Sequence, residues 1–212
     1  MTTFLLKDSK GFTFIEMIVS IGIFTTVLFI AMSAFLSIVN GDHKSRAMRV
    51  ATDNLNLALE DMSRKIKTGT TYNCGGAVSG VQDCVTGNNI LAFTSQDTLS
   101  RILYKRGVGP SAIVNGTSAS GCGDALFAAT QGCILREDAG VSMLATSPEL
   151  NISNLKFYVF GSAPFGVVAG TDKVQPKVVI VIEGSLGADA TLLSGNAGFK
   201  IQTTVTQRAY DN

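Results

Sequence analysis

The stretch that decides the fold is Lys10-Gly11-Phe12-Thr13-Phe14-Ile15-Glu16, which opens an apolar run from Met17 to Val39. That run holds 23 consecutive residues without charge or proline, and a helix of that length spans roughly 35 Å. The hydrocarbon core of a bilayer is about 30 Å thick, so the run predicts a membrane-spanning helix. Glu16 stands at its edge, and an acidic side chain near the bilayer centre costs about 2.5 to 3.5 kcal/mol. Glu16 therefore either lies at the headgroup level or has a charged partner.

The residues around Glu16 resemble the processing signal of type IV pilins and of type II secretion pseudopilins. The matching features are a short basic leader, a glycine, an aromatic residue, an aliphatic residue and the acid, carried by Lys7, Lys10, Gly11, Phe12, Ile15 and Glu16. The resemblance implies that a prepilin peptidase/N-methyltransferase cuts after Gly11 on the cytoplasmic side and methylates the new amino terminus of Phe12. Phe14 stands where the family more often has leucine, which changes the shape of the side chain but not its polarity.

Cleavage after Gly11 would give Glu16 a charged partner. The new amine lies on Phe12, four residues or one helical turn before Glu16, and the two are expected on one face of a helix. In the family, the partner is thought to be the amine of a neighbouring subunit, so that both charges enter the filament together. Because an unpaired buried carboxylate is costly, we expect Glu16 to drive or register assembly with other pilin or pseudopilin subunits through their N-terminal helices.

Two other kinds of N-terminal segment are alternatives. A secretory signal peptide has an apolar core of about 7 to 15 residues and a small-residue cleavage site, whereas this run is longer and no A-x-A sequence closes it. An uncleaved signal anchor, which keeps its leader, is the second alternative. We favour a cleaved leader at residues 1–11 ahead of the apolar helix.

The flanking charges alone do not give the orientation in the membrane. The leader carries two lysines and an aspartate, and the other flank carries three basic residues and an aspartate: Lys7, Lys10 and Asp8 against Lys44, Arg46, Arg49 and Asp42. This count weakly favours the reverse of the pilin topology. The cleavage signal must face the cytoplasm, however, and four cysteines suit an oxidising compartment. We therefore expect a single-pass protein of the cytoplasmic (inner) membrane, with its N-terminus in the cytoplasm and its head domain outside, that later enters a pilus or pseudopilus.

Length and composition allow one membrane helix and one globular domain. The chain has 212 residues, of which 46% are hydrophobic, and a second full domain would be cramped. We expect a leader at 1–11, an N-terminal helix at 12–67 and a β-rich head at 68–212; the helix lies in the membrane at about 14–39 and is amphipathic at 42–67. Asn40-Gly41-Asp42 marks a possible break or bend, because glycine costs about 1 kcal/mol inside a helix. A net charge of +1 implies no basic face for nucleic acid.

The second half of the helix and the head show the periodicities of an α+β protein. Apolar residues recur every three or four positions in this half-helix, at Ala47, Ala51, Leu55, Ala58, Leu59, Met62 and Ile66, which predicts a stripe packed on the head. Strands are expected at 89–95, 100–106, 133–137, 154–160, 177–183 and 199–207. Residues 178–182 are apolar on both faces and indicate a central strand, while 199–207 alternate and indicate a half-buried one. We expect a pilin-like α+β fold with the helix laid across a mainly antiparallel sheet.

Four cysteines lie in the head, at Cys74, Cys84, Cys122 and Cys133, and they permit three pairings. We favour the local pairs Cys74–Cys84 and Cys122–Cys133, because each would close a glycine-rich loop and stabilise the fold by about 2 to 4 kcal/mol. A zinc site made of all four cysteines is the alternative, but such a site wants ligand pairs separated by only about two to four residues. The spacing in this chain is wider than that.

Few residues point to catalysis, a metal or a cofactor. His43 is the only histidine and lies among charged residues beside the apolar run, and neither H-E-x-x-H nor G-x-S-x-G occurs. Asp172, Glu183 and Asp189 could contribute to a calcium site, but they lack the D-x-[DN]-x-[DN]-G spacing. We therefore expect no enzyme activity and no cofactor, and a membrane-anchored enzyme is the least favoured reading.

The C-terminal part of the head also resembles minor pilins and J-type pseudopilins, more weakly than the N-terminal motif resembles the family. The similar segments are residues 155–160, 175–178 and 202–208. Together the resemblances imply a structural minor subunit of a type IV pilus or a type II secretion pseudopilus. The alternative is a filament-tip adhesin or a substrate-binding minor pilin, in which the loops closed by the cysteine pairs form the contact surface.

Overall fold

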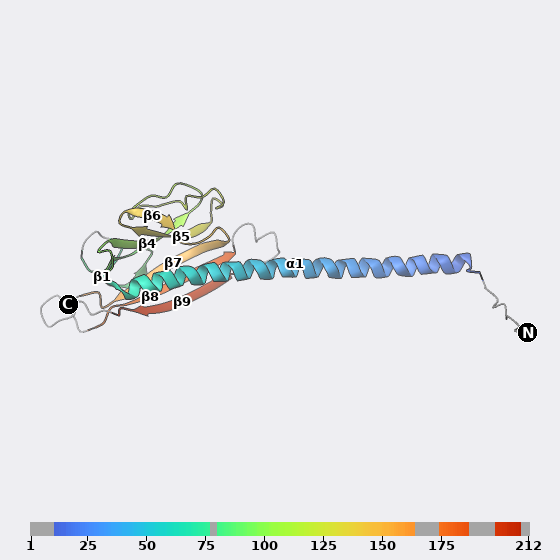
Figure 1. Ribbon diagram of the computed structural model, residues 1–212, viewed down its shortest axis with the longest axis horizontal. Helices are drawn as coiled ribbons and strands as arrows, with labels where there is room; N and C mark the ends of the chain where they lie inside the picture. Colours follow the sequence, from blue (N-terminus) through green and yellow to red (C-terminus); the bar gives the residue numbers. More distant parts are fainter. Residues whose placement is uncertain (1–10, 77–79, 164–173, 187–197, 209–212) are drawn as a thin grey trace, which may run out of the picture. The chain divides into compact units, whose positions relative to one another are not determined.

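A computed structural model describes residues 11–76, 80–163, 174–186 and 198–208 of the chain. The chain divides into two compact units, residues 1–44 and residues 45–212, which we call the N-terminal unit and the head unit. Helix α1, Phe14–Lys67, begins in the N-terminal unit and ends in the head unit, and all the described strands belong to the head unit (Figure 1).

Helix α1 runs without interruption through Asn40, Gly41 and Asp42, so the expected break at this point is wrong. A glycine inside a helix costs only about 1 kcal/mol and keeps the backbone N–H that the helix needs. Proline would remove that N–H, but the first proline of the chain is Pro110. The helix begins at Phe14, two residues after the expected start, and ends at Lys67 as expected.

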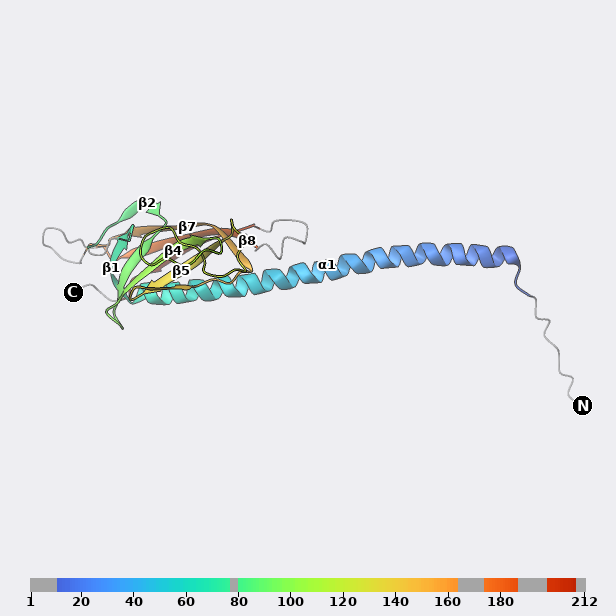
Figure 2. The same ribbon diagram turned by 90° about the horizontal axis from the view of Figure 1, so that it is seen from above.

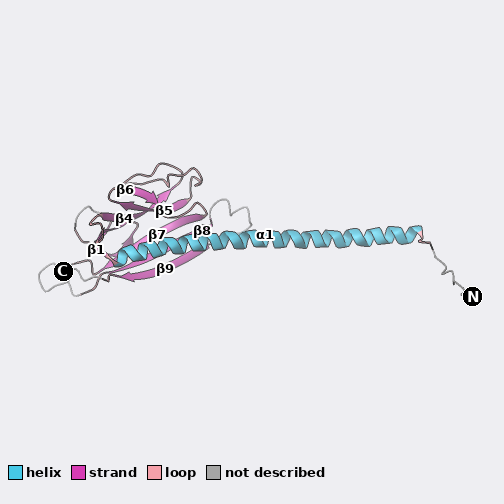
Figure 3. Cartoon of the chain, in the orientation of Figure 1, coloured by secondary structure: helices cyan, strands magenta, loops and turns pink. Residues whose placement is uncertain are grey.

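The head unit contains two antiparallel sheets (Figure 3). The first has the strand order β1-β3-β4-β5-β6, with bounds Gly69–Cys74, Leu91–Ser95, Arg101–Val108, Gly132–Asp138 and Val141–Leu144. The second has the order β2-β7-β8-β9, with bounds Cys84–Asn88, Leu150–Phe160, Lys177–Leu186 and Gly198–Thr206. The expected strands correspond to β3, β4, β5, β7, β8 and β9, whereas β1, β2 and β6 were not predicted. The α+β architecture is confirmed, with two sheets in place of the expected single one.

Strands β8 and β9 behave as their sequences predict. β8 lies between β7 and β9 and is therefore a central strand, with Val178, Ile180 and Ile182 buried. β9 pairs only with β8 among the described strands. Its residues alternate between exposed and at least half-buried positions, and Val205 is fully buried. The period of two thus marks a strand with one face toward the core.

The core of the head unit lies between one face of α1 and both sheets. Five members of the predicted stripe are buried, namely Ala51, Leu55, Ala58, Met62 and Ile66. All of these except Ala58 share one hydrophobic cluster with Phe93 of the first sheet and Phe157 of the second, both completely buried. Figures 1 and 2 show this part of α1 lying along the strands. Burying a large apolar side chain contributes about 1.5 to 3 kcal/mol relative to exposure, so the stripe fixes the helix on the head.

The C-terminal end of α1 is tied to the strands that follow it. The buried hydroxyl of Tyr72 on β1 donates to the carbonyl oxygens of Ile66 at 2.5 Å and of Gly69 at 2.8 Å. The backbone N–H of Arg208, just after β9, donates to the carbonyl oxygen of Lys67 at 2.8 Å. Because the last carbonyls of a helix have no partner within it, these contacts complete the helix end and hold β9 beside it.

Candidate processing and assembly site

The expected cleavage bond joins two exposed residues ahead of α1. Gly11 and Phe12 both precede the helix, and the side chain of Phe12 is 87% exposed. A Cβ built on Gly11 would meet no described atom within 4 Å. The Gly11–Phe12 bond is therefore not covered by any described part of the chain. The leader lysines, Lys7 and Lys10, lie outside the described residues.

Thr13 sets the start of the helix. Its backbone oxygen accepts the N–H of Met17 at 3.2 Å, and its Oγ1 accepts the N–H of Glu16 at 3.3 Å. Thr13 is thus the N-cap of α1, and Glu16 is the third residue inside the helix. The sequence T-x-x-E is the pattern of a capping box, so a signal for this cap was present in the motif and was missed.

Glu16 and Phe12 do not share a helical face in the full-length chain. Phe12 lies before the cap and outside α1 in the uncleaved chain. The expected placement of the two residues one turn apart concerns the chain cut after Gly11, and it stays a prediction. Glu16 is exposed in the first turn, where a carboxylate interacts favourably with the positive end of the helix dipole. The cap residue lies between them, because Thr13 is the N-cap and the helix begins after it.

The first part of α1 exposes its apolar side chains. Its large hydrophobic residues, from Phe14 to Ile38, are 49% to 80% exposed. The helix is long and apolar enough to cross a membrane, with a mean hydropathy of 2.3 in an 18-residue window. Four hydroxyls of this part donate to carbonyl oxygens three or four residues earlier, those of Ser20, Thr25, Thr26 and Ser33. These polar groups thus need no partner from lipid, which fits a membrane anchor.

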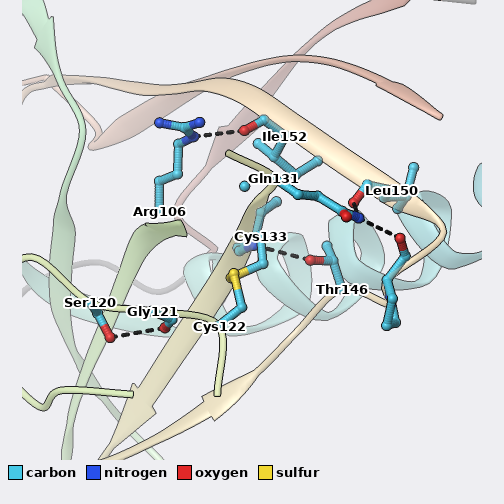
Figure 4. The surroundings of a disulfide bond; sticks show 12 residues. Arg106, Ser120, Gly121, Cys122, Gln131, Cys133, Thr146, Leu150 and Ile152 are labelled. Carbon is cyan, nitrogen blue, oxygen red and sulfur yellow. Dashed lines mark hydrogen bonds between the residues drawn. A yellow bond between two sulfur atoms is a disulfide. The ribbon is translucent and has the colours of Figure 1, made fainter. Parts of the chain in front are cut away.

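Both local disulfides are present, Cys74–Cys84 and Cys122–Cys133. The first does more than close a loop, because it joins β1 of the first sheet to β2 of the second. The second is buried beside Phe127 and holds the segment that follows β4 against β5 (Figure 4). None of the four cysteines is left free, so none is available for the alternative zinc site.

Side chains near Cys122–Cys133 connect the first sheet to the second (Figure 4). Nε of Arg106, on β4, donates to the carbonyl oxygen of Ile152 on β7 at 2.6 Å. The buried Gln131 donates from Nε2 to the carbonyl oxygen of Leu150 at 3.0 Å. These hydrogen bonds satisfy buried polar atoms and hold the disulfide-linked segment to both sheets.

Lys105, on β4, holds the following loop over the first sheet. Its side chain is buried, and Nζ donates to the carbonyl oxygens of Val114, of Gly116 at 2.6 Å and of Ser118 at 3.3 Å. Burial lowers the pKa of the Lys105 ammonium, and the charge of Glu137 opposes this shift. Lys105 was not predicted to have such a role, because a lone lysine in a strand is usually solvent-exposed.

A polar contact holds α1 to the first sheet. Oδ2 of Asp61, on α1, accepts hydrogen bonds from Nη1 of Arg136 at 2.8 Å and from the hydroxyl of Tyr104 at 3.2 Å. Burial raises the pKa of Tyr104, and the negative charge of Asp61 raises it further, so the hydroxyl stays protonated. Asn54 of the same helix donates to Oγ of Ser147 at 2.8 Å. These contacts fix the rotation of the helix on the sheet.

The described residues contain no group of three or more His, Cys, Asp or Glu side chains that could hold a metal ion. Glu183, one of the calcium candidates, pairs with Nζ of Lys200 at 2.6 Å and so links β8 to β9. Asp172 and Asp189, the other two candidates, lie outside the described residues. His43 is exposed on α1. The motif from Gly11 to Glu16 is therefore the candidate functional site that the sequence and the structure share.

Comparison with known proteins bears on this motif alone. No curated protein and no solved structure matches the chain. Residues 6–32 match the model of the prokaryotic N-terminal methylation motif, a range that includes Gly11, Phe12, Thr13 and Glu16. The match supports a type IV pilin-like family and indicates a precursor of the pilin or pseudopilin type that prepilin peptidase processes.

Proposed function

We propose that the chain is a structural minor subunit of a type IV pilus or of a type II secretion pseudopilus. In this proposal, prepilin peptidase cuts after Gly11, its N-methyltransferase activity modifies Phe12, and the mature subunit assembles with other pilin or pseudopilin subunits. It acts on no substrate and needs no cofactor. The observation that carries the proposal is the exposed segment from Gly11 to Glu16 directly ahead of the exposed apolar part of α1.

The proposed topology places the N-terminus in the cytoplasm and the head unit outside it. The processing motif supports this orientation, since the peptidase works at the cytoplasmic face. The two disulfides support it independently, because disulfides persist in oxidising compartments and are rare in the cytosol. Protease added to intact spheroplasts should therefore digest the head unit, and protection of the head unit would contradict this topology.

Mass spectrometry of the mature N-terminus tests the processing step. The expected product begins with N-methylated Phe12 and lacks residues 1–11. A Gly11→Val variant should keep the leader, because a β-branched side chain then stands at the exposed position before the cut. Recovery of the native protein with its first eleven residues attached, in cells where it functions normally, would overturn the proposal.

Glu16 is proposed to register the subunit during assembly. Cleavage removes the residues before Phe12 and leaves a positively charged amine near the capped end of α1. A carboxylate that enters a filament core without a partner is costly, so Glu16 and such an amine from a neighbouring subunit would be buried together. The N-cap supports this role, because it fixes the first turn that carries Glu16.

Substitution of Glu16 tests the assembly step separately from processing. Glu16→Gln and Glu16→Ala should leave membrane insertion intact and strongly lower incorporation into filaments, measured by immunoblotting of sheared or purified filaments. Glu60→Gln is the matched control, because Glu60 is an exposed acid on the part of α1 in the head unit. Normal incorporation of both Glu16 variants into filaments would contradict the proposed role of Glu16 in assembly.

A minor subunit is favoured over a major one by the loop-rich head and by the similarity of residues 155–160 and 202–208 to minor components. A second candidate role, binding at a filament tip, is favoured by a cavity of about 570 Å³ on the head unit. Its lining includes Arg101, Glu137 and several glycines. A cavity of this size with a few charged groups suits a small ligand or a partner loop.

Filling the cavity separates the two roles. Thr117→Arg places a long side chain in the cavity lining, and Ser111→Arg adds the same charge to an exposed position outside the lining. If the head binds a ligand there, Thr117→Arg should abolish adhesion or substrate capture while filament assembly continues. Equal behaviour of both variants and the wild type would leave only the structural role.

A further inference from the structure

The loop above the first sheet contains an Asn-Gly pair in an open turn. Asn115 is exposed, and Gly116 has a positive φ of 77°. A Cβ built on Gly116 would meet no atom within 4 Å. Asn-Gly is the dipeptide in which a backbone nitrogen most easily reaches the preceding side-chain amide, because glycine has no side chain to obstruct the approach. The surroundings of this pair therefore decide its chemical stability.

Three groups of the first sheet contact the pair, two of them at the atoms that such a reaction uses. The backbone N–H of Gly116 donates to Oε2 of Glu137 at 2.5 Å. The side-chain oxygen of Asn115 accepts the backbone N–H of Ser142 at 3.1 Å. Nζ of Lys105 donates to the carbonyl oxygen of Gly116 at 2.6 Å. The backbone nitrogen of Gly116, which would attack, thus contacts the carboxylate of Glu137. The side-chain oxygen of Asn115, whose amide would be attacked, contacts the N–H of Ser142.

We propose that Asn115-Gly116 is a self-modifying site, at which Glu137 promotes conversion of Asn115 into aspartate or isoaspartate. The backbone nitrogen of Gly116 attacks Cγ of Asn115 and forms a new C–N bond. Glu137 takes the proton from that nitrogen and returns it to the departing side-chain amide nitrogen, which leaves as ammonia. Solvent water then opens the resulting succinimide. Attack at the former side-chain carbonyl gives aspartate, and attack at the former backbone carbonyl gives isoaspartate with its carboxylate at that position.

Each contact has a role in this step. A backbone amide is a poor nucleophile until it loses its proton, and Glu137 lies within the hydrogen-bond reach that a general base requires. The Ser142 N–H is placed to stabilise negative charge as it develops on the Asn115 side-chain oxygen, in the manner of an oxyanion hole. Lys105 holds the turn in one conformation, which lowers the entropic cost of bringing the groups together.

The site is open to the water that the second step consumes. Gly116 and Glu137 both line the cavity of about 570 Å³, and Asn115 itself is exposed. The conversion adds a negative charge beside that cavity, next to Glu137. The head unit would thus exist in an amidated and an acidic form that differ at one accessible surface.

A second Asn-Gly pair in the same chain provides the internal control. Asn40-Gly41 lies inside α1, where the N–H of residue 41 is bonded along the helix. The helical backbone also keeps that nitrogen away from the side chain before it. Both pairs have the same local sequence chemistry, so a difference in their rates reports on the folded surroundings.

Peptide mapping by mass spectrometry tests the proposal on the full chain in detergent, aged at neutral pH. Asn115 should convert faster than the same pair in a synthetic peptide of residues 111–120, and Asn40 should convert more slowly than in its own peptide. Glu137→Gln keeps an acceptor oxygen but removes the base, and should slow conversion at Asn115 by roughly tenfold or more. Asn115→Asp supplies the mass and retention standard for one product.

Either of two results would overturn the proposal. One is a rate at Asn115 in the folded chain that equals or falls below the rate in the peptide, which would mean that the hydrogen bonds protect the pair. The other is an unchanged rate of Asn115 conversion in Glu137→Gln, which would show that Glu137 does not act as the base. The comparison of folded chain with peptide holds even where the variant unfolds, because it uses the wild-type protein alone.

Discussion

The two halves of α1 belong to one uninterrupted helix but differ in the exposure of their apolar side chains. Up to Ile38 the large hydrophobic residues are exposed. After Ser45 one face of the helix is buried against the head, with Met62 and Ile66 completely covered. The second half therefore draws its stability from the chain's own sheets. The first half has no such partner within the described residues, and under the proposed function lipid and other subunits would cover it.

The largest expected difference between the halves comes from removing the same side chain in each. Met62 is fully buried, whereas Met32 is 57% exposed. Met62→Ala should lower the free energy of unfolding of the head unit by about 2 to 5 kcal/mol, because it leaves a cavity in the core. Met32→Ala should leave this free energy unchanged. Chemical denaturation of both variants in detergent, followed through the head unit, measures the contrast.

Ile66→Ala and Ile30→Ala repeat the test with another matched pair, since Ile66 is completely buried and Ile30 is 69% exposed. A contrary result would be that Met32→Ala and Ile30→Ala lower the free energy of unfolding of the head as much as Met62→Ala and Ile66→Ala do. That result would show that the stability of the head depends on the first half of α1. The stability of the head unit would then not be independent of the N-terminal unit.

The next effect in size concerns the link between the two sheets. A Cys74→Ser/Cys84→Ser double variant should lower the free energy of unfolding of the head by about 2 to 4 kcal/mol, because the disulfide restricts the unfolded chain. Cys84 is half-buried while Cys122 and Cys133 are fully buried. A mild reductant should therefore open Cys74–Cys84 first, as alkylation and mass spectrometry would show. Reduction of both disulfides at the same rate would contradict this order.

The parts of the fold that the sequence predicted are those whose pattern is local. α1 follows from its apolar run and its period of three to four, and β8 and β9 follow from their apolar and alternating patterns. β1 and β2 are short and contain threonine, asparagine and glycine. β2 forms because Cys84 pairs with Val159 of β7, far along the chain. Its strand conformation is fixed by that distant partner and cannot be read from its own residues.

The functional residues divide in the same way. The motif from Gly11 to Glu16 was predictable because its members are contiguous, and the Thr13 cap could have been found from the T-x-x-E pattern. Lys105 and Glu137 were not predictable. Their roles depend on a loop that folds back over β4 and β5, and only the structure brings Gly116 to both side chains.

A smaller effect is expected at the cap itself. Thr13→Ala removes the oxygen that accepts the Glu16 N–H and should destabilise the first turn of α1 by about 1 kcal/mol. Hydrogen exchange at residues 14–17 should become faster, while the head unit unfolds at the same denaturant concentration as the wild type. Thr13→Ser keeps the hydroxyl and is the control. If the alanine variant exchanges no faster than the serine variant, Thr13 does not cap the helix.

The smallest effect is expected at the edge of the second sheet, where Glu183 of β8 meets Lys200 of β9. The hydrogen bond from Lys200 lowers the pKa of Glu183, and a second one from Asn154 adds to the shift. A lowered carboxyl pKa means that the pair stabilises the fold above the ordinary pKa of glutamate. That contribution is lost as the pH falls through the lowered value.

Glu183→Gln should therefore lower the Tm of the head slightly at neutral pH, and the gap from the wild type should close in acid. The effect is small because Lys200 is exposed and Glu183 is only partly buried, so solvent screens the pair. Lys200→Gln should lower the Tm by a similar amount, and combining it with Glu183→Gln should add little, since either change removes the same pair. Glu149→Gln, at an exposed position, is the control. A gap that stays constant from neutral to acidic pH would mean that Glu183 contributes by packing and not by its charge.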